Sequence, residues 1–188
     1  MNAMAMADRS ATPDGLLAAR ARQGDRAAFA ALVERHYDFI FRVAFRLTGR
    51  RDAAEDVAQE VCVRLGGAIA GYRGGAAFTT WLYAIVLNAA RDALRSASRE
   101  AARAEAFGLH AALAGGFGPE PDDPAEALWA AVRELPDKQR EAVTLVYGEG
   151  LSHAAAAEAL GIAEPTVSWH VHEAKKRLKA LLRPAGDN

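Results

Sequence analysis

The chain has 188 residues, enough for one or two small domains, and 51% of them are hydrophobic, enough for a buried core. Alanine accounts for 45 residues while β-branched residues are sparse, which favours helices over sheets. A single cysteine, Cys62, excludes internal disulfides and Cys-x-x-Cys zinc sites, and a net charge of −1 excludes a uniformly basic surface. No apolar run reaches the roughly 18 residues of a membrane span. We therefore expect a cytoplasmic all-α protein with no cofactor, metal ion or membrane insertion.

The N-terminal part is predicted to form one helical domain over residues 16–97, after a disordered segment at 1–15 without a signal peptide. Asp25 and Asp52 can cap helices, and Gly24 and Gly49 can end them. The predicted helices run from Asp14 to Gln23, from Asp25 to Thr48, from Asp52 to about Leu65 and from Phe78 to about Ser98. A glycine-rich loop is expected between the last two, over 66–77.

A linker is predicted over 98–127, because residues 107–124 are rich in glycine, proline and acidic residues. Charge is uneven around it. Residues 16–97 carry twelve arginines against eight acidic residues, 98–128 carry two arginines against six, and 164–183 carry five bases against two. Basic segments on either side of an acidic linker are a hint of nucleic-acid binding.

The C-terminal part is predicted to form a second helical domain over residues 128–183. Four helices are expected, at Pro124–Glu134, at Pro136–Tyr147, after Ser152 to Leu160, and from about Pro165 to Arg183. The last two have the spacing of a helix-turn-helix, with a small Ala157 at the helix crossing and Gly161 at the turn. The predicted buried stripe of the final helix is Val167, Val171, Ala174, Leu178 and Leu181.

The rest of that final helix offers short polar and aromatic groups near its start and lysines further on. Such groups suit base edges and phosphates respectively. The candidate residues are Thr166, Ser168, Trp169, His170, His172, Glu173, Lys175, Lys176 and Lys179. The alternative interpretation is a helical hairpin with a solvated basic end.

The helix that starts at Phe78 carries an aromatic ring, an amide and guanidiniums along one line. Single-stranded nucleic acid is bound by this mixture of stacking, edge-reading and cationic groups. The preceding loop could shape a pocket for an unstacked base. The candidate residues are Tyr72, Arg73, Phe78, Trp81, Tyr83, Asn88, Arg91 and Arg95. The alternative is that the aromatic residues belong to the core.

The helix that starts near Asp52 has an acidic outward surface. It suits docking of a basic protein partner, although acidic residues in a first turn also complement the helix dipole. The candidate residues are Asp52, Glu55, Asp56, Gln59 and Glu60. No sequence pattern of a metalloprotease, a phosphate-binding loop or a serine hydrolase occurs, so an enzyme is not expected.

Three segments together resemble a bacterial sigma factor of the extracytoplasmic-function group. They are DAAEDVAQEVCVRL at 52–65, FTTWLYAIVLNAARDALR at 78–95 and the stretch from Leu135 to Leu178. The resemblance implies a non-enzymatic subunit of RNA polymerase. Residues 52–65 would dock on the clamp helices of the polymerase's largest subunit, 78–95 would melt and read the −10 element, and the C-terminal domain would read the −35 element.

The resemblance also implies that Tyr72, the loop after Leu65 and Asn88 hold a base flipped from the −10 strand, and that an anti-sigma factor binds the chain. Ser168, His170 and Glu173 stand where this family often has Lys or Arg, so an unusual −35 sequence is expected. Two alternatives remain open. A stand-alone helix-turn-helix regulator would use only the C-terminal domain, and a sigma mimic would only sequester an anti-sigma factor.

Overall fold

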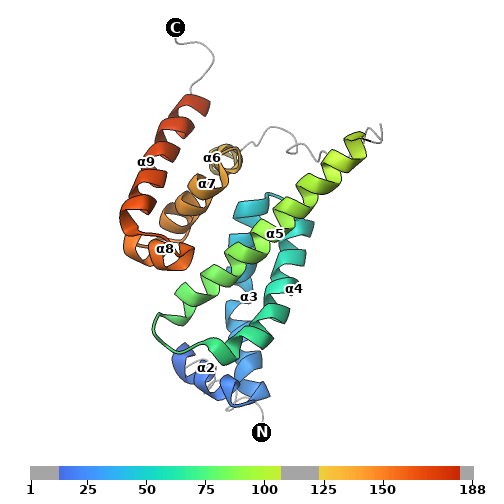
Figure 1. Ribbon diagram of the computed structural model, residues 1–188, viewed down its shortest axis with the longest axis vertical. Coiled ribbons are helices and arrows are strands. Elements are labelled where there is room, and N and C mark those ends of the chain that lie inside the picture. Colours follow the sequence, from blue (N-terminus) through green and yellow to red (C-terminus); the bar gives the residue numbers. More distant parts are fainter. Residues whose placement is uncertain (1–12, 107–122, 183–188) are drawn as a thin grey trace.

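The computed structural model describes residues 13–106 and 123–182, which form helices with no strand among them. This confirms the all-α prediction. Figure 1 shows two groups of helices, α2–α5 and α6–α9. The elements are α2 (Asp14–Arg22), α3 (Arg26–Thr48), α4 (Arg51–Ala68), a 3₁₀ turn η1 (Ile69–Gly71), α5 (Phe78–Ala106), α6 (Pro124–Arg133), α7 (Asp137–Val143), a π-helical turn η2 (Thr144–Gly148), α8 (His153–Leu160) and α9 (Glu164–Leu181).

The N-terminal helices α2, α4 and α5 pack around α3. Neighbouring residues determine where α3 begins and ends. The Asp25 side chain accepts hydrogen bonds from the backbone N–H groups of Ala27 and Ala28, both at 3.0 Å, which satisfies two of the free donors of the first turn. Gly49 ends α3 at φ 72°, in the left-handed region that favours glycine. Both features were predicted from the sequence.

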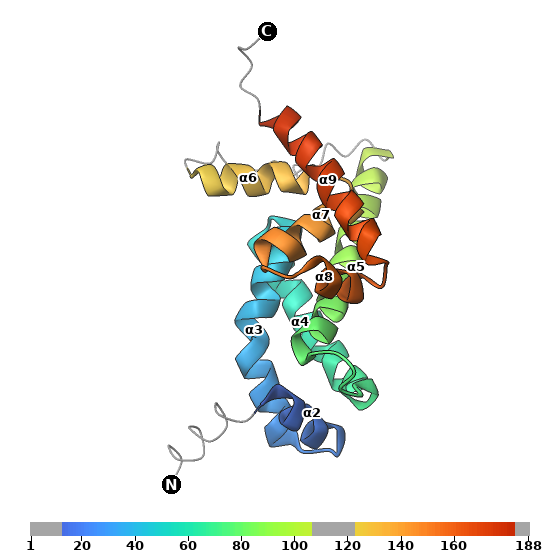
Figure 2. The ribbon, with the colours of Figure 1, turned by 90° about the vertical axis from the view of Figure 1, so that its left-hand side faces the viewer.

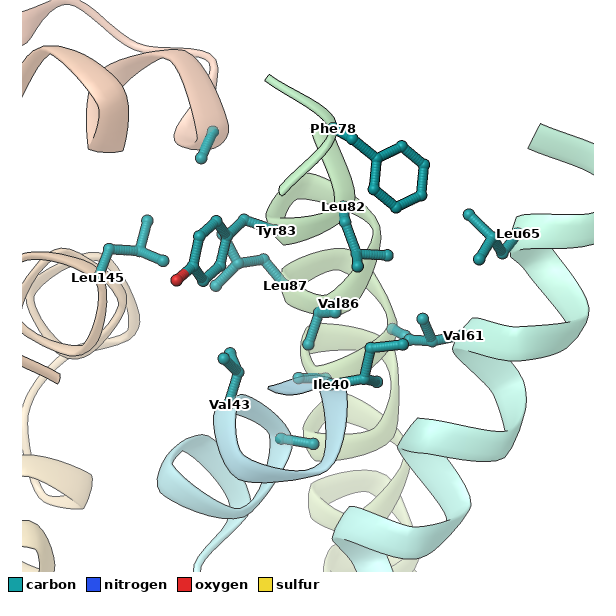
Figure 3. Packing of buried hydrophobic residues seen from close by; sticks show 14 of the residues in the cluster. Ile40, Val43, Val61, Leu65, Phe78, Leu82, Tyr83, Val86, Leu87 and Leu145 are labelled. Atoms are coloured by element: carbon teal, nitrogen blue, oxygen red, sulfur yellow. The ribbon is translucent and has the colours of Figure 1, made fainter. Parts of the chain in front are cut away.

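The core of this group fills the space between α3, α4 and α5. The inner side of α4 is fully buried at Ala54, Val57, Ala58, Val61 and Leu65. Figure 3 shows Val61 and Leu65 pointing from α4 toward Leu82 and Val86 of α5. The apolar residues of α4 and α5 therefore lie on the sides of these helices that face each other.

Three predicted boundaries in this half were wrong. Helix α4 begins at Arg51, so Asp52 lies in the first turn and is not the cap. It also continues through Gly66 and Gly67 into η1, because tertiary packing outweighs the roughly 1 kcal/mol that each glycine costs a helix. Helix α5 runs to Ala106 and not to Ser98, so residues 98–106 of the predicted linker are helical. Residues 107–122 lie outside the described part of the chain.

The segment predicted to be disordered also overlaps α2. Asp14 and Gly15 form its first turn, and Asp14 contacts two residues of α3. Its Oδ1 lies 2.5 Å from Arg35 Nη1, and its Oδ2 lies 2.9 Å from Nε2 of the buried His36. These contacts order the start of α2. Residues 1–12 are not described.

The C-terminal helices α6–α9 contain the predicted helix-turn-helix. Ser152 Oγ accepts from Ala155 N at 3.2 Å and caps α8. Gly161 has φ 66°, and the N–H of Ile162 bonds to the Ala157 carbonyl at 3.1 Å, which closes the turn before α9. The predicted helix over 136–147 is instead a short α7 followed by the π-helical η2.

The two groups pack directly against each other. Leu145 of η2 is fully buried and points toward Tyr83 and Leu87 of α5 (Figure 3). One continuous hydrophobic cluster contains residues of α3, α4 and α5 together with residues of α8 and α9. Helix α8 packs on α5, and η2 and α6 pack on α3; Figure 2 shows α6 crossing above α3. The described residues therefore form a closed arrangement of the two domains.

Candidate nucleic-acid and polymerase interfaces

Helix α9 presents the predicted contrast between a buried and an exposed side. Val167, Val171, Ala174 and Leu178 are buried against its neighbours. Leu181, predicted to extend this stripe, is 54% exposed, because the stripe ends with the helix. Ala163 precedes the helix and provides no side-chain cap, so Pro165 in the first turn supplies the local start signal.

In the first two turns of α9, Ser168 is held by hydrogen bonds and Trp169 is exposed. Ser168 Oγ lies 2.8 Å from His153 Nδ1 of α8 and 3.3 Å from the Glu164 carbonyl, so its hydroxyl is held within the helix-turn-helix. Trp169 is 57% exposed and contacts the His170 ring at 4.9 Å between centroids. Thr166 is exposed and His170 half-buried. Trp169 is therefore a large exposed side chain at the start of α9.

The second half of α9 is basic. Lys175 lies over the Tyr147 ring, 4.9 Å from its centroid, and Lys176 Nζ lies 3.4 Å from the half-buried Glu173. His172 and Lys179 are exposed. These groups form a cationic surface next to Trp169, as a phosphate-binding region requires.

At the start of α5, the aromatic candidates pack on one another. Tyr72 and Phe78 are buried, Trp81 is half-buried, and their ring centroids lie 5.1–5.6 Å apart. The Tyr72 hydroxyl donates to the Ala76 carbonyl at 2.9 Å, which fixes the loop before α5. Arg73 in that loop is exposed. Of these rings, Trp81 is the one with substantial surface left for a base.

Further along α5, the polar candidates follow Trp81 on one side of the helix. We call Trp81, Asn88, Arg91 and Arg95 the α5 line. Asn88 and Arg95 are exposed. The Asn88 Oδ1 accepts from Arg91 Nη1 at 2.8 Å. Seven residues separate Trp81 from Asn88, which corresponds to about 10 Å along the helix.

Arg91 is also held by the C-terminal domain. Its Nη2 lies 2.7 Å from Glu141 Oε2 of α7, and its Nε donates to the other carboxylate oxygen. The Glu141 side chain is only 3% exposed. The hydrogen bond that Arg91 donates to Glu141 is the main reason that the pKa of Arg91 is raised. In the closed arrangement this guanidinium is therefore occupied.

A second carboxylate from the C-terminal domain lies on Tyr83. Glu149 follows η2, and its side chain is 3% exposed. The Tyr83 hydroxyl donates to Glu149 Oε2 at 3.2 Å, and Arg42 Nη2 lies 2.9 Å from the same oxygen. Arg46 donates to the other oxygen, Oε1. Burial first, and the Glu149 charge second, raise the pKa of Tyr83.

Sequence reasoning did not identify Arg42, Arg46, Glu141 or Glu149. Arg42 and Arg46 stand at i and i+4 on α3, a spacing that places both on one side of a helix. That signal could have indicated a paired cationic site. Nothing in the sequence indicates which carboxylate, 103 or 107 residues away, would reach it.

The acidic candidates lie on α4. Asp52, Asp56, Gln59 and Glu60 are exposed and Glu55 is half-buried. Ion pairs join Arg50 to Asp52, Arg51 to Glu55 and Arg64 to Glu60. Arg50 and a neighbouring backbone N–H lower the pKa of Asp52 to about 2. Among the described residues Asp56 carries no ion pair, so it is the carboxylate most available to a basic partner.

The described residues contain no metal-binding cluster and no membrane-spanning helix. Within 13–106 and 123–182 there is no group of three His, Cys, Asp or Glu residues arranged to hold a metal ion. No helix in this part of the chain has the length and apolarity to cross a bilayer. Cys62 is half-buried on α4, and burial raises the pKa of its thiol.

Comparison with known proteins matches both halves of the chain. The family models for Sigma-70 region 2 and Sigma-70, region 4 match residues 32–100 and 125–178. The ECF RNA polymerase sigma factor SigW of Bacillus subtilis (strain 168) is 30% identical over 174 residues, which cover 86% of this chain and 92% of SigW.

Two solved structures are similar to the whole arrangement. One is CnrH in complex with the cytosolic domain of CnrY, with a TM-score of 0.67 and 30% identity over 90% of this chain and 96% of that chain. The other is the sigma factor RpoE in complex with the anti-sigma factor NepR from Bartonella quintana, with a TM-score of 0.65 and 25% identity over 82% of this chain and 96% of that chain.

Proposed function

Since the chain belongs to the extracytoplasmic-function group of the sigma-70 family, and is thus an RNA polymerase sigma factor that initiates transcription, we propose how its surfaces divide the work. Helix α5 captures the opened −10 strand, α9 reads the −35 duplex, and α4 docks on the core polymerase. The observation that carries this proposal is the α5 line, in which a half-buried Trp81 is followed by an exposed Asn88 and by Arg91 and Arg95.

Strand opening on α5 needs a favourable interaction that exists only with unpaired bases. Trp81 rests on Tyr72 and Phe78, so its ring is held in place before DNA arrives. A base stacked on an aromatic side chain contributes about 1–3 kcal/mol. This offsets an unpairing cost of a few kcal/mol for one base, provided that Asn88 and the arginines bind the same strand. Tyr83 is buried at the domain interface, which leaves Trp81 as the principal stacking ring.

The −35 element is proposed to be read by the first turns of α9 in the major groove. Trp169 stands where this family commonly has a small residue, and Ser168 is restrained by His153. The reading of bases then depends on Thr166, Trp169 and His172, while Lys175, Lys176 and Lys179 bind phosphates. Glu173 pairs with Lys176, which reduces the cationic charge available at this end of the helix.

Polymerase docking is proposed for the exposed acidic side of α4. Asp56 and Glu60 lie one helical turn apart, at positions that a basic helix can contact together. Glu60 is already paired with Arg64, so Asp56 should contribute more to a new interface. Reversal of both charges should weaken binding to core polymerase in a pull-down, whereas unchanged affinity would remove this assignment.

We also infer that an anti-sigma factor regulates the chain. RpoE, similar to this chain along most of its length, is bound to the anti-sigma factor NepR in its solved structure. Such a partner would act by covering the surfaces assigned here to polymerase and DNA. The protein is proposed to have no catalytic activity of its own, and to work in the cytoplasm, where core polymerase and the nucleoid are found.

Promoter opening in vitro tests the assignment of α5. Trp81→Ala and Asn88→Ala should reduce open-complex formation by the reconstituted holoenzyme, while core-polymerase binding stays unchanged. Glu100→Ala, an exposed change on the distal part of α5, is the control. Normal promoter melting by both variants would refute this placement. DNA binding by the chain without any polymerase binding would instead favour a stand-alone regulator.

A further inference from the structure

The closed arrangement places two nearly buried carboxylates of the C-terminal domain on cations of the N-terminal domain. Glu149 and Glu141, which we call the carboxylate clamp, each have 3% of the side chain exposed. Eight residues separate them along the chain, and eight residues separate Tyr83 from Arg91 on α5. Glu149 contacts Tyr83, and Glu141 contacts Arg91. The segment from Glu141 to Glu149 therefore runs antiparallel to α5, with a contact at each of its two ends.

The groups that receive Glu149 form a defined oxyanion site. Arg42 binds it through two nitrogens, with Nε 3.3 Å from Oε1 and Nη2 2.9 Å from Oε2. Arg46 donates to Oε1, and the Tyr83 hydroxyl donates to Oε2. We call Arg42, Arg46 and Tyr83 the arginine–tyrosine site. Two guanidiniums and a phenol thus converge on one carboxylate.

The chemistry of this site suits phosphate at least as well as carboxylate. A guanidinium presents parallel N–H donors that match two oxygens of either anion. A phosphodiester has two such oxygens and one negative charge. All three donors come from α3 and α5, so the site stays with the N-terminal domain when the domains separate. Arg42 is 49% exposed even in the closed chain, so its guanidinium is reachable from solvent.

We propose that the arginine–tyrosine site binds a phosphate of the DNA strand captured by α5, and that the carboxylate clamp occupies this site and Arg91 in the closed chain. Glu149 and Glu141 therefore act as internal competitors of DNA. Tyr83 of this site belongs to α5, the helix that carries the α5 line, and Arg91 of that line is held by the other glutamate of the carboxylate clamp. The inference rests on the proposed role of α5 and adds Arg42 and Arg46 to the DNA-binding residues.

The carboxylate clamp also explains how opening and binding are linked. The N–H groups that a glutamate holds are not available to a phosphate at the same time. DNA that binds only the open chain shifts the equilibrium toward separated domains, by an amount set by its preference for that state. Removing the charge of Glu149 should favour the open state without touching any residue of the α5 line.

The test measures binding of the full-length protein, without polymerase, to a fluorescently labelled single-stranded DNA oligonucleotide of mixed sequence. Glu149→Gln keeps the size of the side chain and removes its charge. We expect it to bind the oligonucleotide about tenfold more tightly than the unchanged protein. Glu158→Gln is the matched control, because Glu158 is exposed on α8 and the change in net charge is the same.

The gain in affinity of Glu149→Gln for the oligonucleotide must depend on the arginine–tyrosine site. Adding Arg42→Gln and Arg46→Gln to Glu149→Gln should abolish the gain in affinity. It should also lower the salt dependence, because each lost phosphate contact on a single strand reduces the slope of log K against log salt concentration by about 0.7. Circular dichroism checks that every variant keeps its helices. Equal gains for Glu149→Gln and Glu158→Gln, a gain that survives loss of both arginines, or no detectable binding by Glu149→Gln would overturn the proposal.

The proposed function of α5 is tested independently of the arginine–tyrosine site. Trp81→Ala and Asn88→Ala act on promoter opening by the holoenzyme, whether or not the arginine–tyrosine site exists. Loss of opening in those variants together with a failed Glu149→Gln test would reject this site alone. Normal opening in those variants would reject the role of α5, and with it the reason for a phosphate to lie there.

Discussion

Replacing Leu145 by alanine should separate the two domains before it unfolds either of them. The Leu145 side chain is fully buried between η2 and α5, where it points toward Tyr83 and Leu87 (Figure 3). Truncating a buried leucine to alanine costs about 2–5 kcal/mol, from lost transfer free energy and the cavity left behind. Because part of the cavity faces α5, part of that cost falls on the contact between the domains.

Leu178→Ala is the matched control for this prediction. It removes the same atoms from the second hydrophobic cluster, which contains Val132, Leu135, Val143 and Ala174 of the C-terminal domain and no described residue of α2–α5. Both substitutions should lower the free energy of unfolding in urea. Leu145→Ala alone should weaken the interdomain contact, and a loss of 2 kcal/mol there lowers the population of closed chains relative to open ones by about 30-fold.

Small-angle X-ray scattering, at a temperature well below the unfolding transition, reports the difference. The radius of gyration should increase for Leu145→Ala and stay the same for Leu178→Ala, while circular dichroism shows that both keep their helices. An unchanged radius for Leu145→Ala would refute the reasoning. An equal increase in both variants would mean that loss of the C-terminal core, and not of the interface, causes the expansion.

Three further outcomes follow from single residues. Gly49→Ala should lower the free energy of unfolding in urea by about 1–2 kcal/mol or more, because it forces a side chain into the left-handed region; the new Cβ would also lie 2.5 Å from Arg133 Cδ. Cys62 should react slowly with thiol reagents at neutral pH, because burial raises the pKa of its thiol, and a rate equal to that of a free thiol would contradict this. The pKa of Tyr83 is raised above its usual 10.0 by burial and by Glu149, so its contribution to stability is present below pH 10 and lost as the pH rises above it. Urea unfolding across alkaline pH should therefore show a smaller loss for Tyr83→Phe than for the unchanged protein.

Much of the fold could be predicted from the sequence because its causes are local. The cap at Asp25, the left-handed ends at Gly49 and Gly161, and the buried stripe of α4 each depend on a few neighbouring residues. Predictions failed where distant contacts decide the outcome. Gly66 extends α4 against its own helix propensity, and the Cβ position of Gly66 lies 3.8 Å from the Phe29 ring of α3.

The candidate site was predictable in part, for the same reason. Trp81 and Asn88 could be placed on one side of α5 by helical periodicity alone. Tyr83 could not be recognised as an interface residue, because its burial depends on Leu145 and Glu149 of the other domain. A single sequence carries no record of such pairings, so the carboxylate clamp became visible only in the structure.

The point at which α5 ends, Ala106, limits how far the C-terminal domain can travel from α5. Sixteen residues, 107–122, separate the end of α5 from the described start of the C-terminal part. A chain of that length spans at most about 58 Å when fully extended, which equals roughly 17 base pairs of B-DNA at 3.4 Å each. Tethering also keeps the undocked domain at an effective concentration that can reach millimolar. The interface therefore needs only modest intrinsic affinity to keep the chain closed, and can still give way to a DNA duplex within reach.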